Sequence, residues 1–277
     1  MTNFIRSASN SYPNGKKTEV ILPGLSDDGE DVVISMITSE EQRDDASALL
    51  NRMYEWRGYG SHHRLSKGVT QTSFSVSCAG ATIGTLTLTV DSEAGLTTDT
   101  TFQAELDTYR RMPGARICEL TRFAFDAPSS SKRILAALFH VIFIYGQRKY
   151  GCTDLFIEVA QRHRRFYEAM LGFERVCALK TNDNVGVPSQ LMRLNVADIQ
   201  SHIEAHAGSA DPASSRSLYS NFLPKEEANR VYAELADAIH AINIVNEPDY
   251  IQFDVIPSAP VRQRRYGNPQ SATPSAA

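Results

Sequence analysis

Residues 118–126, CELTRFAFD, form an apolar run that predicts a buried strand, yet Glu119 and Arg122 place an acid and a base within it. Burying a charge is costly unless the charge is paired or has a chemical task. On a regular strand the two side chains point to opposite faces of the sheet, because side chains alternate with a period of two. A β-bulge would bring both to one site, and bulges are common next to active sites.

Two roles for Glu119 and Arg122 follow from their residue types. In a structural role they form an ion pair that ties the strand to a neighbouring helix. In a catalytic role Glu119 accepts a proton from an attacking amine through a water molecule, while Arg122 holds a carboxylate or orients Glu119. The residue types alone leave both roles open.

Composition narrows the class of protein. The chain has 277 residues, 42% of them hydrophobic, which is enough for one core with extensions. Its net charge of -4 argues against a nucleic-acid partner, because such proteins usually carry a basic excess. The four cysteines have no paired spacing, so the sequence predicts neither a metal site nor a disulfide framework. With no signal-peptide pattern and no membrane-length apolar stretch, we expect a cytoplasmic protein.

Composition shifts divide the chain into four parts. Residues 31–200 are expected to form the folded domain. Residues 1–30, rich in Ser, Asn, Gly and Asp, and residues 257–277, rich in Pro, Ser and Ala, are expected to be disordered. Residues 201–256 are expected to contain a linker and a C-terminal helix.

The hydrophobic periodicity predicts an α/β fold, with a mixed sheet flanked by helices and a C-terminal helical extension. A hairpin turn is predicted at Ala79-Gly80. The C-terminal helix is expected to pack on the domain or to join two copies as a homodimer. Strands are predicted at residues 32–37, 71–77, 82–90, around Glu119, 154–159, 175–180 and 191–196, and helices at 39–56, 102–111, 132–150, 162–170 and 225–242.

A serine-rich loop follows the Glu119 strand and leads into the long helix. It consists of Ser129, Ser130 and Ser131, followed by Lys132 and Arg133. Free N–H groups and the dipole at a helix start favour phosphate, and the two cations add charge. The serines equally fit an ordinary N-cap.

Two basic clusters lie near helix ends. Arg148 and Lys149 lie in the last turn of the long helix, and Arg162, Arg164 and Arg165 begin the next one. Cations at a helix start oppose its dipole, and this cost indicates an anionic partner. A solvated surface is the alternative.

Aromatic side chains accompany the cations in two places. Arg52, Trp56 and Arg57, at the end of the first helix, could cover an acyl pocket or simply stack on the surface. Tyr167 could protonate a leaving thiolate, although a tyrosine with aromatic neighbours is more often part of a core.

Several short segments occur in a specific order, and together they resemble N-acyl amino acid synthases. These enzymes are long-chain relatives of acyl-homoserine-lactone synthases, within the Gcn5-related N-acyltransferase fold. The resemblance covers roughly residues 32–196. The matching segments are GTLTL at 84–88, DS at 91–92, GL at 95–96, ELD at 105–107, CELTRF at 118–123, LFH at 138–140, TDLFIEV at 153–159, RH at 162–163, FY at 166–167 and LGF at 171–173.

The resemblance implies transfer of a long-chain fatty acyl group from the phosphopantetheine thioester of an acyl carrier protein to the amine of an amino acid. It implies Glu119 and Arg122 at the site, with Phe123 and Ala124 beside the acyl donor. No metal and no permanently bound cofactor are expected. The basic clusters would then contact the carrier protein.

Two departures from the family pattern bear on these implications. Residues 129–133 replace the glycine-rich pyrophosphate loop of coenzyme-A-dependent relatives, which favours a carrier-protein donor. Ala160-Gln161 stands where Asn-Pro is expected, so the position of that loop is open. Two alternative functions are a coenzyme-A-dependent N-acetyltransferase of small amines and a catalytically silent module that binds acyl chains or carrier protein.

Overall fold

The centre of the molecule is a nine-stranded mixed sheet with the strand order β1-β2-β3-β4-β5-β6-β9-β7, and β8 pairs with β9. The computed structural model describes residues 18–60, 62–65, 67–126, 132–183, 186–207 and 216–246. Neighbouring strands are antiparallel except β5 and β6, which are parallel. The strands are β1 Glu19–Leu22, β2 Val32–Met36, β3 Gln71–Cys78, β4 Ala81–Val90, β5 Ile117–Phe125, β6 Asp154–Ala160, β7 Glu174–Arg175, β8 Lys180–Asn182 and β9 Val187–Asn195.

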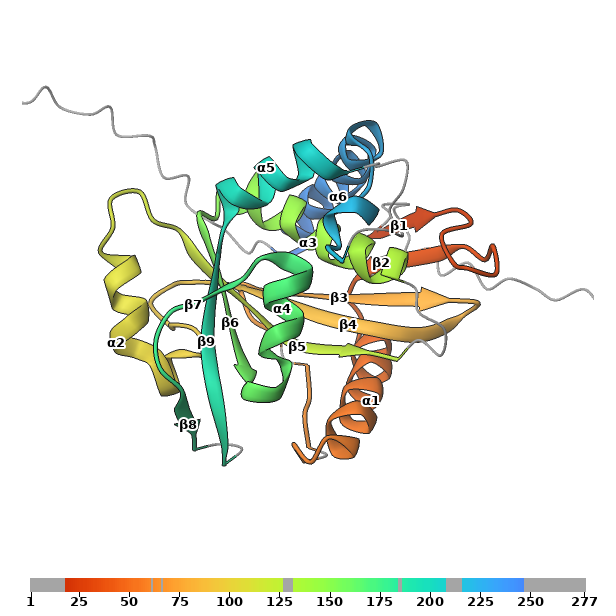
Figure 1. The fold of residues 1–277 in the computed structure, drawn as a ribbon. Coiled ribbons are helices and arrows are strands. Elements are labelled where there is room, and N and C mark those ends of the chain that lie inside the picture. The colour runs from red at the N-terminus through yellow and green to blue at the C-terminus, as the bar shows by residue number, and fades with distance from the viewer. Residues whose placement is uncertain are drawn as a thin grey trace, which may run out of the picture.

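Helices cover both faces of this sheet. In Figure 1, α3, α5 and α6 lie above the sheet, and α1 and α2 lie toward the other side. The arrangement confirms the predicted α/β fold class. The helices are α1 Glu40–Trp56, α2 Asp99–Arg110, α3 Lys132–Tyr150, α4 Arg164–Leu171, α5 Val196–His206 and α6 Lys225–Asn246, with short 3₁₀ turns η1 Gln161–His163 and η2 Tyr219–Asn221.

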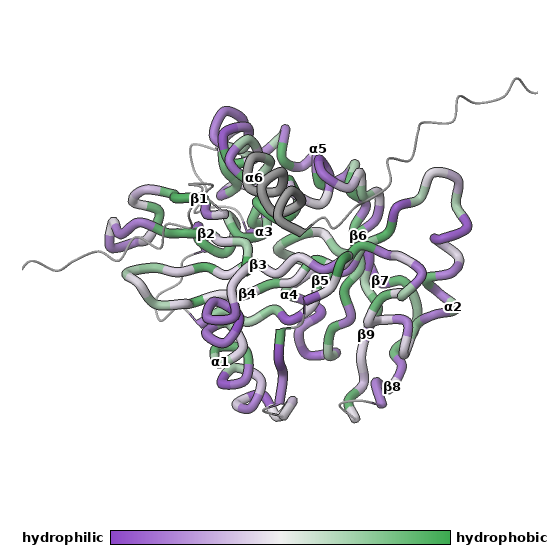
Figure 2. Tube along the Cα trace, turned by 180° about the vertical axis from the view of Figure 1, so that it is seen from behind, coloured by the Kyte–Doolittle hydropathy of each residue, from purple (hydrophilic) through white to green (hydrophobic). Residues whose placement is uncertain are grey.

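The main apolar core lies between the sheet and α3. Most of α3 is buried, as expected for a helix that is apolar on nearly every side. The sheet packs against one face of α3. The C-terminal segment with η2 and α6 covers the opposite face of this helix. Figure 2 shows hydrophobic residues along β6 in the centre and more hydrophilic stretches at α1, α2 and β8.

Local sequence signals explain where elements begin and end. Ser39 and Gln42 form a capping box at the start of α1, which satisfies backbone N–H groups that have no partner within the helix. The predicted hairpin turn is confirmed, because Ala79 and Gly80 join β3 to β4 with positive φ angles of 48° and 77°. Gly172 closes α4 in the left-handed conformation.

The structure corrects the prediction for the ends of the domain. β1 lies inside the segment 1–30 that composition predicts to be disordered. It is ordered because Val20 and Leu22 are fully buried in the main core. α5 crosses the predicted domain boundary at residue 200. Residues 1–17 and 257–277 lie outside the described part of the chain.

Two further elements differ from the prediction. The single strand expected at 175–180 is two short strands, β7 and β8, because Val176 and Cys177 turn to pack against the apolar cluster of α2. The C-terminal helix is confirmed, and Ala228, Val231 and Leu235 are buried in its own domain. These three residues are therefore packed within one chain, and a homodimer through α6 remains a prediction.

A buried histidine joins α3 to the C-terminal segment. His140 is 1% exposed, accepts a hydrogen bond at Nδ1 from the Leu223 N–H at 3.0 Å, and stacks on Phe222 with ring centroids 4.7 Å apart. Burial, assisted by the positive charge of Arg148, lowers its pKa to about 3. Its role here is structural rather than catalytic.

This pKa predicts a loss of stability in acid. Below pH about 6.5 the unfolded chain binds a proton at His140 that the folded chain does not bind. The free energy of unfolding should therefore fall by up to about 1.4 kcal/mol per pH unit between pH about 6 and 4. Urea unfolding of the wild type and of His140→Asn, which keeps an acceptor, measures this. Equal pH slopes in the two proteins would contradict it.

Candidate active site

The parallel strands β5 and β6 diverge in the middle of the sheet. They pair only where Ile117, Cys118 and Glu119 face Asp154, Leu155 and Phe156. Beyond that point β5 continues along β4 and β6 continues along β9. In Figure 1 β5 runs to the right and β6 downward. The diverging end of β5 leads to the start of α3, and that of β6 leads to the start of η1.

A bulge is present in β5, which the alternation of side chains alone did not predict. Thr87 faces Thr121, but Thr85 faces Ala124, so β5 contains one extra residue between these pairs. Arg122 lies in this extra segment with a φ of 52°, a left-handed conformation that is uncommon for any residue except glycine. The bulge sits just beyond the point where β5 and β6 separate.

Glu119 is completely buried and fully hydrogen-bonded. Its Oε1 accepts from the Thr97 N–H at 2.7 Å, and Oε2 accepts from the Thr98 N–H at 3.1 Å and from the Thr98 hydroxyl. The carboxylate thus ties β5 to the chain entering α2. Among the described residues no cation lies within ion-pair distance of Glu119, so the expected ion pair with Arg122 is not formed.

Arg122 is half-buried and faces the aromatic residues of α1. Its positive charge lies near Tyr54. Burial raises the pKa of Tyr54 to about 12, and the Arg122 charge opposes part of this rise. No described carboxylate lies within ion-pair distance of the guanidinium. The Arg122 guanidinium is therefore available to an anion that the described residues do not supply.

Tyr167, predicted to be a proton donor, lies beside Tyr54 at the edge of the main core. Its ring makes edge contacts with Phe166 and Phe173, with centroids 5.1 and 5.8 Å apart. Burial raises its pKa well above the usual value for tyrosine, so the hydroxyl stays protonated at neutral pH. The role of the hydroxyl in proton transfer remains a prediction.

The predicted lid residues of α1 lie across the diverging strands. Arg52 forms an ion pair of 2.8 Å with Asp126 at the end of β5. The carbonyl of Arg57 accepts a hydrogen bond of 3.0 Å from Arg162. The Arg57 guanidinium stacks over Trp56, which is 80% exposed. These contacts join the end of α1 to both strand ends, and Trp56 covers no buried pocket.

The two predicted basic clusters lie far apart. Arg148 and Lys149 end α3 beside the start of β6, whereas Arg162, Arg164 and Arg165 follow its far end. The seven residues of β6 separate them by about 20 Å. A contact centred on the strand ends therefore lies closer to Arg162, Arg164 and Arg165 than to Arg148 and Lys149.

The expected donor-binding residues are only partly described. Ser129, Ser130 and Ser131 lie outside the described residues. Lys132 and Arg133 begin α3 at the same end of the sheet as η1. Phe123 packs on Phe139 with centroids 5.5 Å apart, and Ala124 packs under α1, so both face the interior.

The groups that hold Glu119 in place were not predicted from the sequence. Thr97 and Thr98 precede α2, and their only signal is the preference of threonine for helix starts. Arg110, at the end of α2, binds Asp91, Asp99 and Asp107 at 2.7 to 2.9 Å. This network fixes the loop that carries the Glu119 hydrogen bonds.

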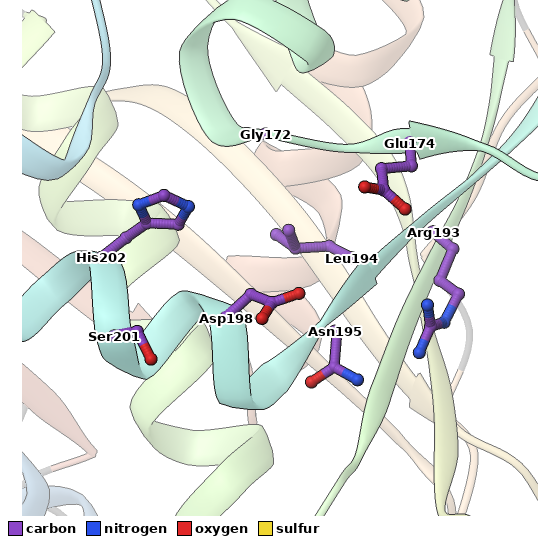
Figure 3. A pocket seen from close by; sticks show the side chains of 8 residues that line it. All are labelled: Gly172, Glu174, Arg193, Leu194, Asn195, Asp198, Ser201 and His202. Atoms are coloured by element: carbon purple, nitrogen blue, oxygen red, sulfur yellow. The ribbon is translucent and has the colours of Figure 1, made fainter.

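Two cavities lie away from the diverging strands. Figure 3 shows one of about 260 Å³ between β7, β9 and α5, with Glu174, Arg193, Asp198 and His202 around it. It lies near the start of β6, because Asn195 in its wall pairs with Asp154. The other, of about 450 Å³, is beside Arg110. Neither contains the predicted catalytic residues.

The described residues contain neither a metal-binding cluster nor a membrane-spanning helix. Within these ranges no three His, Cys, Asp or Glu side chains are placed to share a metal ion. None of the helices described there has the length and apolar character needed to cross a bilayer.

Comparisons with known proteins bear on this geometry. No curated protein matches the chain. The solved structure of FeeM, an N-acyl amino acid synthase from uncultured soil microbes, is 25% identical with a TM-score of 0.54, over 61% of this chain and 94% of that one. The AHL synthase LasI is 12% identical with a TM-score of 0.47, over 61% and 91%. An N-acetyltransferase from Staphylococcus aureus Mu50 is 14% identical with a TM-score of 0.41, over 60% and 98%.

The family model described as N-acyl amino acid synthase FeeM matches residues 45–195, more than half of the chain. This range includes most of α1, the Arg122 bulge, both diverging strands and the chain entering α2. The site built from these elements is thus the part of the molecule that the family shares. The chain belongs to the N-acyl amino acid synthase FeeM family and is an N-acyltransferase.

Proposed function

We propose that the protein transfers a fatty acyl group from the phosphopantetheine thioester of an acyl carrier protein to the amine of a free amino acid. The observation that carries this proposal is Arg122, whose guanidinium has no described carboxylate partner at the point where β5 and β6 diverge. A guanidinium matches the two oxygens of a carboxylate, and a free amino acid presents one beside its amine.

The proposed reaction places each group in a defined role. Arg122 binds the carboxylate of the amino acid, which positions the amine against the thioester carbonyl. Glu119 accepts the proton that the amine loses, and the thiol of phosphopantetheine leaves. Tyr167, protonated because burial raises its pKa, donates to the leaving sulfur. Positioning and proton transfer account for catalysis, with no permanently bound cofactor.

The charges around the strand ends support a carrier protein as donor. We define the basic rim as Arg57, Arg133, Arg162 and Arg165, which lie at the end of α1, at the start of α3 and just after β6. Arg133, Arg162 and Arg165 are exposed. A rim of this sign favours a donor with an acidic surface. Arg148 and Lys149 lie at the other end of β6 and are left out of this contact.

Mass spectrometry of lipid extracts tests the proposed function. Cells that express the wild type should contain N-acyl amino acids that are absent from cells expressing Glu119→Gln. With purified protein, long-chain acyl carrier protein should be a better donor than the same acyl group on coenzyme A. Free amino acids should be better acceptors than their amides. Turnover of acetyl-coenzyme A with small amines alone would contradict the proposal.

Charge reversal on the rim tests the donor contact. Arg165→Glu should raise the KM for acyl carrier protein about fivefold at low salt, equivalent to about 1 kcal/mol, and the effect should shrink as salt is added. Arg148→Glu, at the other end of β6, is the matched control and should leave this KM unchanged. Equal effects of the two substitutions would exclude a specific contact at the rim.

A further inference from the structure

The face of the sheet under α1 and α2 contains a buried polar band. A face covered by helices is normally apolar, as the α3 face is here. On the other face, Ser73, Thr85, Thr87, Thr89 and Glu119 are all less than 9% exposed. Thr121 lies next to them, opposite Thr87.

This band falls between two apolar clusters. Ile117 packs with the α2 residues Phe102 and Leu106, and Ala124 packs with the α1 residues Leu49 and Leu50. Along β5, Glu119 and Thr121 lie between these clusters, at the position where β5 leaves β6. The polar band therefore connects the buried carboxylate with the diverging strands.

Several hydroxyl groups in the band have no hydrogen-bond partner among the described residues. The hydroxyls of Thr85, Thr89 and Thr121 are buried and form no hydrogen bond with any described group, whereas those of Thr87 and Ser73 bond each other at 2.8 Å. An unsatisfied buried polar group destabilises the folded state. Buried polar groups in folded proteins are usually satisfied by protein or by ordered water.

The positions of two of these hydroxyls form a path. Thr89 lies directly opposite Glu119, and Thr121 is two residues further along β5 on the same face. Opposite Cβ atoms in antiparallel strands are about 5 Å apart and diagonal ones about 7–8 Å. Such gaps suit single bridging waters. Thr85 lies beyond the bulge, opposite Ala124, and is outside this path.

We propose that Thr89 and Thr121 hold a short chain of ordered waters that connects the Glu119 carboxylate to the amine bound at the diverging strands. Glu119 is enclosed by Thr97 and Thr98, so the amine reaches it only through such intermediates. When the nitrogen bonds to the thioester carbon, the C–S bond breaks. The neutral amine loses one proton through the chain to Glu119, and the leaving thiolate takes one from Tyr167. Glu119 then releases its proton to solvent and Tyr167 regains one from solvent, so the turnover has no net change in protons. Thr89 and Thr121 act as positioning residues.

This inference rests on N-acyl transfer and not on the identity of donor or acceptor. The structural test is independent of activity. A crystal structure at high resolution should show waters within hydrogen-bond distance of Thr89 Oγ1 and Thr121 Oγ1. If no ordered water lies within hydrogen-bond distance of either hydroxyl, the proposal is overturned even when the protein makes N-acyl amino acids.

The kinetic test uses Thr89→Val and Thr121→Val, with Thr85→Val as the matched control. It is run with whichever thioester, on carrier protein or on coenzyme A, the wild type uses. Each path variant should lower kcat about tenfold, keep both KM values, and enlarge the solvent deuterium isotope effect on kcat. Thr85→Val should behave as wild type, and Thr121→Ser should restore kcat. An equal loss in all three valine variants, or an unchanged isotope effect, would overturn the relay.

Discussion

Replacement of Glu119 by Gln is expected to lower kcat by about 10²-fold or more, the usual scale for loss of a general base. The amide cannot accept a proton at neutral pH, while the site that binds donor and acceptor stays in place. The KM values should therefore remain near those of the wild type. Steady-state rates with saturating donor and acceptor measure the effect.

The same substitution also has a structural cost, which must be separated from catalysis. The amide replaces one acceptor oxygen with a donor that faces the N–H group of Thr97 or Thr98. The resulting loss of stability should be about 1–3 kcal/mol. Urea unfolding gives this value, and rates are measured where the variant is fully folded.

Thr98→Val is the matched control for Glu119→Gln. It removes the hydroxyl that donates to Oε2 and loosens the same anchor, but it keeps the carboxylate. If Glu119 is the base, Thr98→Val should retain most of its turnover despite reduced stability. Equal loss of turnover in both variants would make Glu119 structural, and wild-type turnover in Glu119→Gln would remove it from the mechanism.

The sequence predicts those parts of the site that depend on neighbours along the chain. An acid and a base in one apolar strand share a site only if the strand contains a bulge, and the structure has one at Arg122. The capping box of α1 and the turn at Ala79-Gly80 also follow from local preferences. In each case the deciding residues are within a few positions of one another.

Contacts between distant segments were not predictable in this way. Glu119 is satisfied by Thr97 and Thr98, more than 20 residues earlier, and nothing in either segment identifies the other. The two basic clusters show the opposite case. Arg148 and Arg162 are close in sequence, yet β6 carries them to opposite ends of the sheet. Residues that are close in sequence can therefore lie far apart in the fold when an extended strand separates them.

Replacement of Arg122 by Gly should separate stability from activity. The left-handed backbone costs a non-glycine residue about 1 kcal/mol, and glycine removes this strain at a similar cost in entropy. The free energy of unfolding should therefore stay within about 1 kcal/mol of the wild type. Loss of the guanidinium should lower kcat/KM for the amino acid about 10- to 100-fold, the scale of a charge-assisted hydrogen bond.

Two controls make this result specific to the carboxylate. Ala79→Gly relieves the other described non-glycine residue with positive φ, in the β3–β4 turn, and should keep full activity. The amide of the same amino acid lacks the carboxylate, so its kcat/KM should be low with the wild type and nearly unchanged by Arg122→Gly. If Arg122→Gly weakens turnover of acid and amide equally, Arg122 does not bind the carboxylate. If Arg122→Gly also unfolds the protein, the Arg122 side chain is needed for packing, because the change of backbone preference alone leaves stability nearly unchanged.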